Sequence, residues 1–334
     1  MPWQWLRSRW QTASVRGVTV SLLSAVVLGL SPIFAKQAYQ AGVPWLSVVA
    51  LRTVIATAAL WLLMLLFARQ YVYIYPMGLA ICAAAGIVNG LGSLLYYSGL
   101  TRLDASLSQL LYALYPIFLT LYYRLDGRPI SAFTLLRLCL GLAAVVLIAQ
   151  VSLRSTVSWV GALLMLGSSA FYALHLFING HVLYEMPAPT VTLYTLTAMS
   201  ATVGVAYVVG GLHGLPALPV SASGWQAVLL LTAATMLSRL LIFAGVKRLG
   251  SLQAALLSLG ETLVAVLAAL VWLGEKLTPV QWLGAALLAA SILLVSREKS
   301  LGAPPPPKPW LQWLEAWFME LAPPPELEGK TPLK

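Results

Sequence analysis

Charged side chains are scarce in this sequence. Asp, Glu, Lys and Arg together make up 9% of the 334 residues, whereas hydrophobic residues make up 60%. Soluble proteins carry about 25% charged residues. A soluble chain this apolar could not cover its surface, so a chain that lies almost entirely in a membrane is indicated. At roughly 20 residues per span, the length accommodates about ten membrane helices joined by short loops.

Cysteine and the signatures of catalysis are also scarce. Cys82 and Cys139, the two cysteines of the chain, stand within apolar segments, which argues against a disulfide framework. The sequence has no H-E-x-x-H metal site, no Walker lysine loop and no sizeable soluble domain for a nucleotide. The serine in "GLGSLL" (90–95) raises the alternative of an intramembrane hydrolase, but nothing singles out a base for it. We therefore expect no enzyme, no cofactor and no metal.

Long apolar runs take up most of the chain. They do not alternate apolar and polar residues, so strands of a membrane β-barrel are excluded. We interpret all ten runs as transmembrane helices of an all-α polytopic membrane protein. The runs cover residues 17–40, 44–68, 73–99, 105–125, 130–151, 158–181, 188–211, 224–246, 250–272 and 278–296.

Positive charge is in excess, with a formal net charge of +10. We expect no nucleic-acid partner, because most Lys and Arg lie just outside the apolar runs, as topology signals do. With the N-terminus in the cytoplasm, eleven of these residues fall inside and four outside, which predicts that both termini of a bacterial inner-membrane protein are cytoplasmic. The inside residues are Arg7, Arg9, Arg16, Arg69, Arg124, Arg128, Lys247, Arg248, Arg297, Lys299 and Lys308; the outside residues are Lys36, Arg102, Arg154 and Lys276.

The two ends of the chain differ from the runs between them. Residues 1–16 combine three tryptophans with arginine, which is typical of an interfacial segment. Residues 301–334 begin with "GAPPPPKP", which cannot form a regular helix. The stretch "WLQWLEAWFMEL" (310–321) then places its large apolar side chains on one helical face, which predicts a short amphipathic helix at the membrane surface.

An internal repeat divides the chain into two halves. "LYYSGLTRLDASLSQLLYALYP" (95–116) aligns without a gap with "LIFAGVKRLGSLQAALLSLGET" (241–262). The halves, 17–151 and 158–296, hold five predicted helices each. Because five is odd, the second half must enter the membrane in the opposite sense. Inverted five-helix repeats of this kind are the building plan of many secondary transporters.

The closing helices of the second half resemble a known family. "LGEKLT" (273–278), "LLYALYPIF" (110–118) and "ALRT" (50–53) are similar to motifs of the EamA domain in the drug/metabolite transporter superfamily, with the amino-acid exporters of the YddG type as the members most resembled. The resemblance implies a central cavity enclosed by helices one to four and six to nine. It also implies peripheral fifth and tenth helices and allows a homodimer. "LDGRPIS" (125–131) lacks the glutamate of the loop motif.

Polar residues form a stripe on the third predicted helix, where Asn89, Ser93 and Tyr97 recur at a spacing of four. The repeat places Thr235 and Arg239 at the corresponding positions of the eighth helix. Both stripes are candidate lining of a binding site. Gly86 and Gly90 of the same stripe form a G-x-x-x-G, which also fits close helix packing.

Arg239 and Glu261 are opposite charges placed deep in adjacent predicted helices, where an unpaired charge is expensive. We expect them to lie near one another or near water. They could form a buried ion pair that fixes packing, or they could bind the carboxylate and the ammonium group of a substrate. Glu261 corresponds to the neutral Tyr115 in the repeat. Arg52 also lies deep in its helix. It could donate hydrogen bonds to backbone carbonyls of a neighbouring helix, or it could act as a gate.

Tyrosines and a histidine complete the candidate site. Six tyrosines could supply an aromatic wall for zwitterionic or aromatic solutes. They are Tyr96, Tyr97, Tyr112, Tyr115, Tyr172 and Tyr194. His175 on the sixth helix is a satisfied interior group or a proton relay. The candidate substrate-binding residues are Asn89, Ser93, Tyr97, Tyr112, Tyr115, Tyr172, His175, Thr235, Arg239 and Glu261.

Together these patterns predict a secondary transporter whose partners are a small-molecule substrate and the lipid bilayer. We expect export of a small polar metabolite by alternating access, with amino acids favoured. Sugars, nucleosides, purines and drugs stay open as substrates. A channel or a structural membrane protein stays open as an alternative function.

Overall fold

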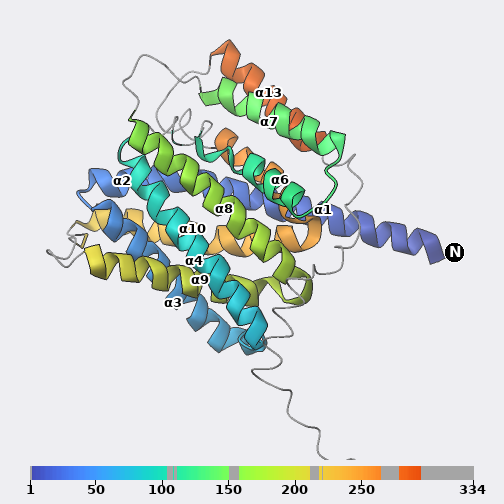
Figure 1. Cartoon of the computed structure of the whole chain (residues 1–334). Helices are drawn as coiled ribbons and strands as arrows, with labels where there is room; N and C mark the ends of the chain where they lie inside the picture. The colour runs from blue at the N-terminus through green and yellow to red at the C-terminus, as the bar shows by residue number, and fades with distance from the viewer. Residues whose placement is uncertain are drawn as a thin grey trace, which may run out of the picture.

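The computed structural model describes residues 2–103, 108, 111–149, 158–210, 218–219, 221–264 and 278–294. All regular elements within these ranges are helices, in agreement with the predicted all-α class (Figure 1). They are α1 (Pro2–Gly29), α2 (Ser31–Gln40), α3 (Trp45–Phe67), the 3₁₀ turn η1 (Arg69–Tyr71), α4 (Pro76–Leu100), α6 (Tyr115–Leu125), α7 (Ala132–Ala149), α8 (Trp159–Glu185), α9 (Ala188–Gly210), α10 (Ala222–Leu249), α11 (Ser251–Ser258) and α13 (Pro279–Leu293).

Six spans within the described residues are long and apolar enough to cross a membrane, so the chain is a multi-pass membrane protein. They are Val15–Gln40, Trp45–Phe67, Pro76–Leu100, Trp159–Leu183, Ala188–Gly210 and Ala222–Leu249. The remaining predicted runs, at 105–125, 130–151, 250–272 and 278–296, contain shorter described helices. The total of ten spans therefore stays a prediction.

Local sequence explains where several helices begin. Ser158 and Ser221 cap α8 and α10, because the side-chain oxygen of each accepts a hydrogen bond from the backbone N–H three residues later. Pro76 opens α4, where its missing N–H costs nothing in the first turn.

The first apolar run is not one regular helix. α1 ends at Gly29 and α2 begins at Ser31, with Pro32 in its first turn. Pro32 has no N–H for the helical ladder, and its ring crowds the carbonyl four residues earlier. The single helix predicted for 17–40 is therefore corrected to a helix with a break. α1 itself starts at Pro2, so the segment 1–16 is continuous with it. Its interfacial location stays a prediction, and the tail 301–334 lies outside the described residues.

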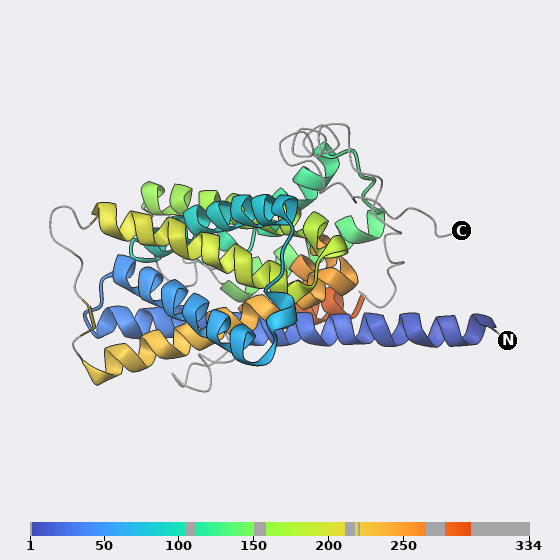
Figure 2. The ribbon, with the colours of Figure 1, turned by 90° about the horizontal axis from the view of Figure 1, so that it is seen from below.

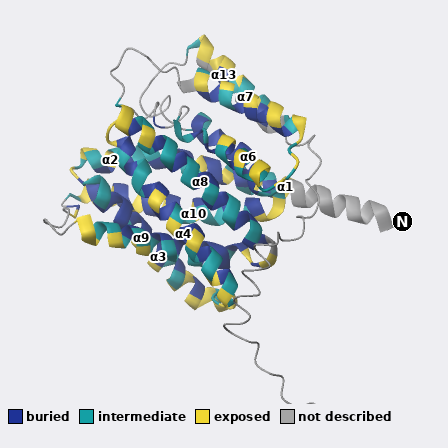
Figure 3. Cartoon of the chain, viewed as in Figure 1, coloured by how far each residue is buried: buried dark blue, intermediate teal, exposed yellow. Residues whose placement is uncertain are grey.

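The helices pack as a bundle with one pair set apart. α4 packs along both α8 and α9, and α1 packs along α10. α7 and α13 contact each other at one side of the bundle (Figure 1). In the view from below, α1 extends well past the other helices (Figure 2). Exposed side chains, many of them large and apolar, gather on outward-facing helix surfaces, as lipid contact requires (Figure 3).

Two apolar clusters lie towards opposite ends of α8 and α10. The first, here the α11-side cluster, lies at their C-terminal ends, and the second, the α2-side cluster, at their N-terminal ends. The α11-side cluster includes Leu176, Val182, Phe243, Val246 and Leu252, and the α2-side cluster includes Ala38, Val49, Leu100, Met165 and Val228. The middle of the bundle, between the clusters, is left for polar groups.

Glycines allow close helix contacts, among them one between α4 and α9 and one between α10 and α1. A Cβ at Gly86 of α4 would collide with the carbonyl oxygen of Thr195 on α9, and Gly90 faces the same helix. A Cβ at Gly245 of α10 would collide with Ser21 on α1. The G-x-x-x-G of α4 therefore has a packing role.

Candidate functional site

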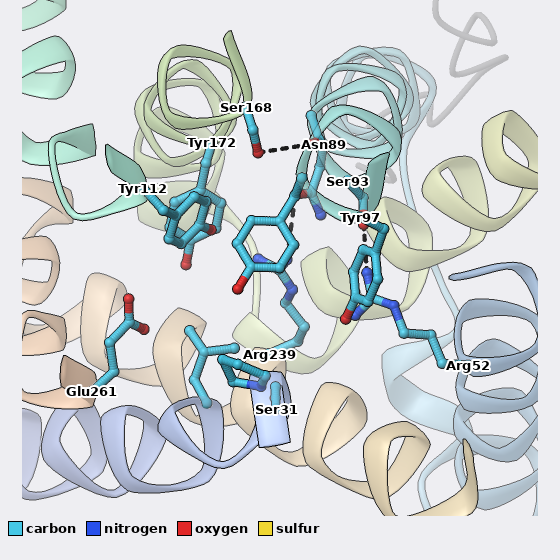
Figure 4. A pocket seen from close by; sticks show the side chains of 14 residues that line it. Ser31, Arg52, Asn89, Ser93, Tyr97, Tyr112, Ser168, Tyr172, Arg239 and Glu261 are labelled. Atoms are coloured by element: carbon cyan, nitrogen blue, oxygen red, sulfur yellow. Dashed lines mark hydrogen bonds between the residues drawn. The ribbon is translucent and has the colours of Figure 1, made fainter. Parts of the chain in front are cut away.

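A pocket lies in the middle of the bundle (Figure 4). Side chains from α1, α2, α3, α4, α8 and α10 line it, together with one residue before α6 and one after α11. The lining residues are Leu28, Ser31, Pro32, Arg52, Asn89, Gly92, Ser93, Tyr96, Tyr97, Tyr112, Ser168, Tyr172, Arg239 and Glu261.

Interrupted helices meet at this cavity. Ser31 follows the break between α1 and α2, and Tyr112 precedes a turn at 113–114 that leads into α6. Glu261 follows a turn at Leu259, after which residues 260–264 are helical again. Transporters typically bind substrates where helices are interrupted at membrane depth.

Arg52 reaches the cavity from α3 and is 6% exposed. Its two terminal nitrogens donate hydrogen bonds to Thr235 of α10, at 3.0 Å, and to Ser93 of α4. Its guanidinium also lies over the ring of Tyr97, 4.5 Å from the ring centre. The Nε atom makes no hydrogen bond to any residue in the described part of the chain. Hydroxyls and an aromatic face thus hold the guanidinium without neutralising its charge.

Arg239 enters from α10, one helical turn beyond Thr235. It donates to Asn89 Oδ1 at 3.3 Å and lies 3.5 Å from His175 Nε2, with its guanidinium 5.3 Å from the ring centre of Tyr172. The other ring nitrogen of His175, Nδ1, lies 3.1 Å from the carbonyl oxygen of Ala85. Nδ1 also lies 3.0 Å from Asn179 Nδ2. Because a guanidinium only donates and a carbonyl oxygen only accepts, we assign Nε2 as the acceptor from Arg239 and place the proton of the neutral imidazole on Nδ1.

Glu261 is 2% exposed and faces the same cavity as the two arginines. Gly29 makes this placement feasible, because a Cβ there would lie 2.6 Å from the backbone oxygen of Glu261. Figure 4 shows Glu261, Arg239 and Arg52 in that order across the view. The cavity therefore carries opposite charges on different sides.

Tyrosines form one wall of the cavity. The ring centres of Tyr96 and Tyr112 lie 4.9 Å apart, and those of Tyr112 and Tyr172 lie 5.4 Å apart. Behind them Tyr115 packs edge-on against Tyr172 at 5.0 Å, and its hydroxyl donates to the carbonyl of Ala255. Such a wall offers both apolar faces and hydroxyl groups to a solute.

The residues predicted from the sequence fall into two layers. Seven of them line the cavity: Asn89, Ser93, Tyr97, Tyr112, Tyr172, Arg239 and Glu261. The other three lie behind these residues. Thr235 accepts a hydrogen bond from Arg52, and His175 accepts one from Arg239. Tyr115 packs against Tyr112 of the tyrosine wall. Their part in binding stays a prediction.

Four polar lining residues were absent from the predicted set: Arg52, Tyr96, Ser31 and Ser168. Ser168 lies one helical turn before Tyr172, so helical spacing could have found it. Ser31 had no such signal, because the break that turns it inward was not predicted. Arg52 was predicted only to bond a neighbouring helix or to act as a gate. The structure places it at the cavity.

The groups that line the cavity are suited to binding a small polar solute. Within the described ranges, no three His, Cys, Asp or Glu side chains are grouped to hold a metal ion. Two guanidinium groups, a carboxylate and several hydroxyls can match the charges of a small polar solute.

Comparisons with known proteins agree with this picture. A family model described as the EamA-like transporter family matches residues 15–150 and 159–297. The chain is 26% identical over 282 residues to the "Uncharacterized transporter YcbK" of Bacillus subtilis (strain 168), covering 80% of this chain and 88% of that protein. A solved structure titled "Crystal structure of protein" covers 86% of this chain and 97% of its own, with a TM-score of 0.68. At 18% identity it shows the fold alone.

Proposed function

Since the chain belongs to the EamA-like transporter family, we propose that its central cavity is the substrate site of a secondary transporter. The substrate is a small polar metabolite, with amino acids as the favoured class. The observation that carries this is the presence of Glu261 and Arg239 in one buried cavity. A carboxylate and a guanidinium can bind the ammonium and the carboxylate of a zwitterion, each with a charge-assisted hydrogen bond.

Alternating access is the proposed mechanism. The cavity lies between the α11-side and α2-side clusters, and each cluster could separate in turn while the other stays packed. At the α11-side end, Lys247 donates to the carbonyl of Met186 at 2.7 Å, and Tyr75 donates to the carboxylate of Glu185 at 2.7 Å. These surface contacts are weak enough to be remade in each cycle.

Direction and location extend the proposal. The lysine and arginine bias favours a bacterial inner membrane with both termini in the cytoplasm, and the family resemblance favours export. A homodimer is part of the same proposal. The inverted relation of the two halves gives the cavity equivalent routes to both sides of the membrane.

Reconstituted liposomes test the function. We expect the purified protein to transport labelled amino acids, with a flux that saturates as the substrate concentration rises. We expect no transport of sugars or nucleosides. A flux that rises without saturation would indicate a channel. Robust transport of sugars or nucleosides, with no amino-acid flux, would overturn the assignment.

Glu261→Gln tests the site itself, because it keeps the shape of the side chain and removes the charge. We expect amino-acid transport to fall at least tenfold, about 1.4 kcal/mol. Asp126→Asn, at the C-terminal end of α6 and outside the cavity lining, is the matched control and should stay within about twofold of wild type. Equal transport by wild type and Glu261→Gln at equal protein amounts would make Glu261 a packing residue.

A further inference from the structure

The charges of the described residues that line the cavity do not balance. Arg52 and Arg239 contribute two positive charges, Glu261 contributes one negative charge, and His175 beside Arg239 is neutral. A charge buried at membrane depth costs several kcal/mol unless it is compensated. The natural compensation for one surplus cation is an occupant that carries one net negative charge.

The two guanidinium groups are hydrogen-bonded to the same face of α4. Arg52 donates to Ser93, and Arg239 donates to Asn89, one turn earlier on the same face of α4. Four residues of helix correspond to roughly 6 Å between these anchors. Each guanidinium has five N–H donors. The described residues accept two from Arg52 and two or three from Arg239. Both groups therefore keep donors for a carboxylate.

Two guanidinium groups whose anchors lie one helical turn apart suit two carboxylates on one short carbon chain. With C–C bonds of about 1.5 Å, the carboxylate carbons of an extended four- or five-carbon diacid lie roughly 4–5 Å apart. Each carboxylate of such a molecule can then reach its own guanidinium. Ser31, whose buried hydroxyl has no hydrogen-bond partner among the described residues, offers one more polar contact.

Glu261 supplies the third point of recognition. In Figure 4, Arg239 lies between Arg52 and Glu261, and Glu261 lies beside the tyrosine wall. An ammonium group next to one carboxylate would face Glu261, while that carboxylate faces Arg239 and the second faces Arg52. From this arrangement we infer that the cavity selects an acidic amino acid, a molecule with two carboxylates and one ammonium group. This inference rests on the proposed transport of amino acids and names the substrate class.

Affinities of three related probes test the inference. The full-length protein in lipid nanodiscs is titrated calorimetrically with L-glutamate, with L-glutamine and with glutarate. Glutamine replaces the second carboxylate by a neutral group of the same shape, and glutarate lacks the ammonium group. We expect glutamate to bind at least tenfold more tightly than either.

Variants test which residue causes the preference for glutamate over glutamine and which causes the preference for glutamate over glutarate. Arg52→Gln should bring the affinities for glutamate and glutamine within about twofold of each other. Glu261→Gln should do the same for glutamate and glutarate. Arg137→Gln, at a buried arginine away from the cavity, should keep both tenfold ratios.

The wild-type ratios decide the inference even if a variant does not fold. Glutamine bound as tightly as glutamate would overturn it and leave amino-acid transport standing. Glutarate bound more tightly than glutamate would overturn the role given to Glu261. If no amino acid binds or moves in liposomes while another solute class does, the proposed function fails as well.

Discussion

Arg52 and Arg137 are both buried arginines of a membrane protein, at 6% and 0% exposure. Their surroundings differ. Arg52 lies at the cavity and is held by two hydroxyls and a tyrosine ring. Arg137, on α7, donates to the backbone oxygen of Ser291 on α13 and to the side-chain oxygen of Gln253 on α11. Ser291 in turn donates its hydroxyl to the backbone oxygen of Arg137 at 2.9 Å.

The comparison shows that burial alone does not identify a binding residue. Arg137 joins the peripheral pair α7 and α13 to α11, with contacts that fix the positions of three helices. Arg52 lines the cavity, where its guanidinium can contact an occupant, whereas Arg137 does not line it. What distinguishes the two arginines is therefore the cavity and the partners of each guanidinium.

The largest expected effect comes from removing the two charges in turn. Arg52→Gln should lower transport of the preferred substrate at least tenfold, because the cavity loses a cation that faces the solute. Arg137→Gln should stay within about twofold, when initial rates in liposomes are divided by the amount of folded protein. Equal losses in the two variants would remove the distinction between cavity and periphery.

A smaller effect, on stability, should appear at Arg137. Arg137→Met leaves the buried amide of Gln253 without the guanidinium, which costs about 1–3 kcal/mol of unfolding free energy. Adding Gln253→Leu should recover much of that loss, because both polar partners are then gone. Tryptophan fluorescence during thermal unfolding in detergent measures the stability of the wild type, of each single variant and of the double variant. Strictly additive losses would show that the two side chains are not coupled.

The smallest effect should come from the ring beneath Arg52. Tyr97→Phe keeps the aromatic face and should leave the KM for substrate within about 1.5-fold of wild type. Tyr97→Leu removes the cation–π contact, worth about 0.5–1 kcal/mol, and should raise KM roughly two- to fivefold. A loss in Tyr97→Phe as large as in Tyr97→Leu would assign the role to the hydroxyl instead.

Sequence spacing predicted which residues share a helix face, but it could not predict their depth. Asn89, Ser93 and Tyr97 recur every four residues on α4, and all three reach the cavity. Thr235 and His175 were equally plausible candidates, yet they stand one layer behind, holding the two arginines. Which layer a side chain occupies depends on packing between helices that are far apart in the sequence.

Helix continuity was the other limit of prediction. The run 17–40 is apolar throughout, so composition indicated one span, and only Pro32 marked the break that brings Ser31 to the cavity. The all-helical class followed directly from the apolar runs. The number of spans and the inverted relation of the two halves are predictions that still await a direct topology measurement.

The glycine contacts set how closely two pairs of helices approach. Gly86 and Gly90 let α4 lie against α9, and Gly245 lets α10 lie against α1. A larger side chain at any of these positions would push the two helices of its pair apart. The hydrogen bond from Arg239 to Asn89 links α10 to α4, so a conformational change that moves one pair away from the other has to break this bond.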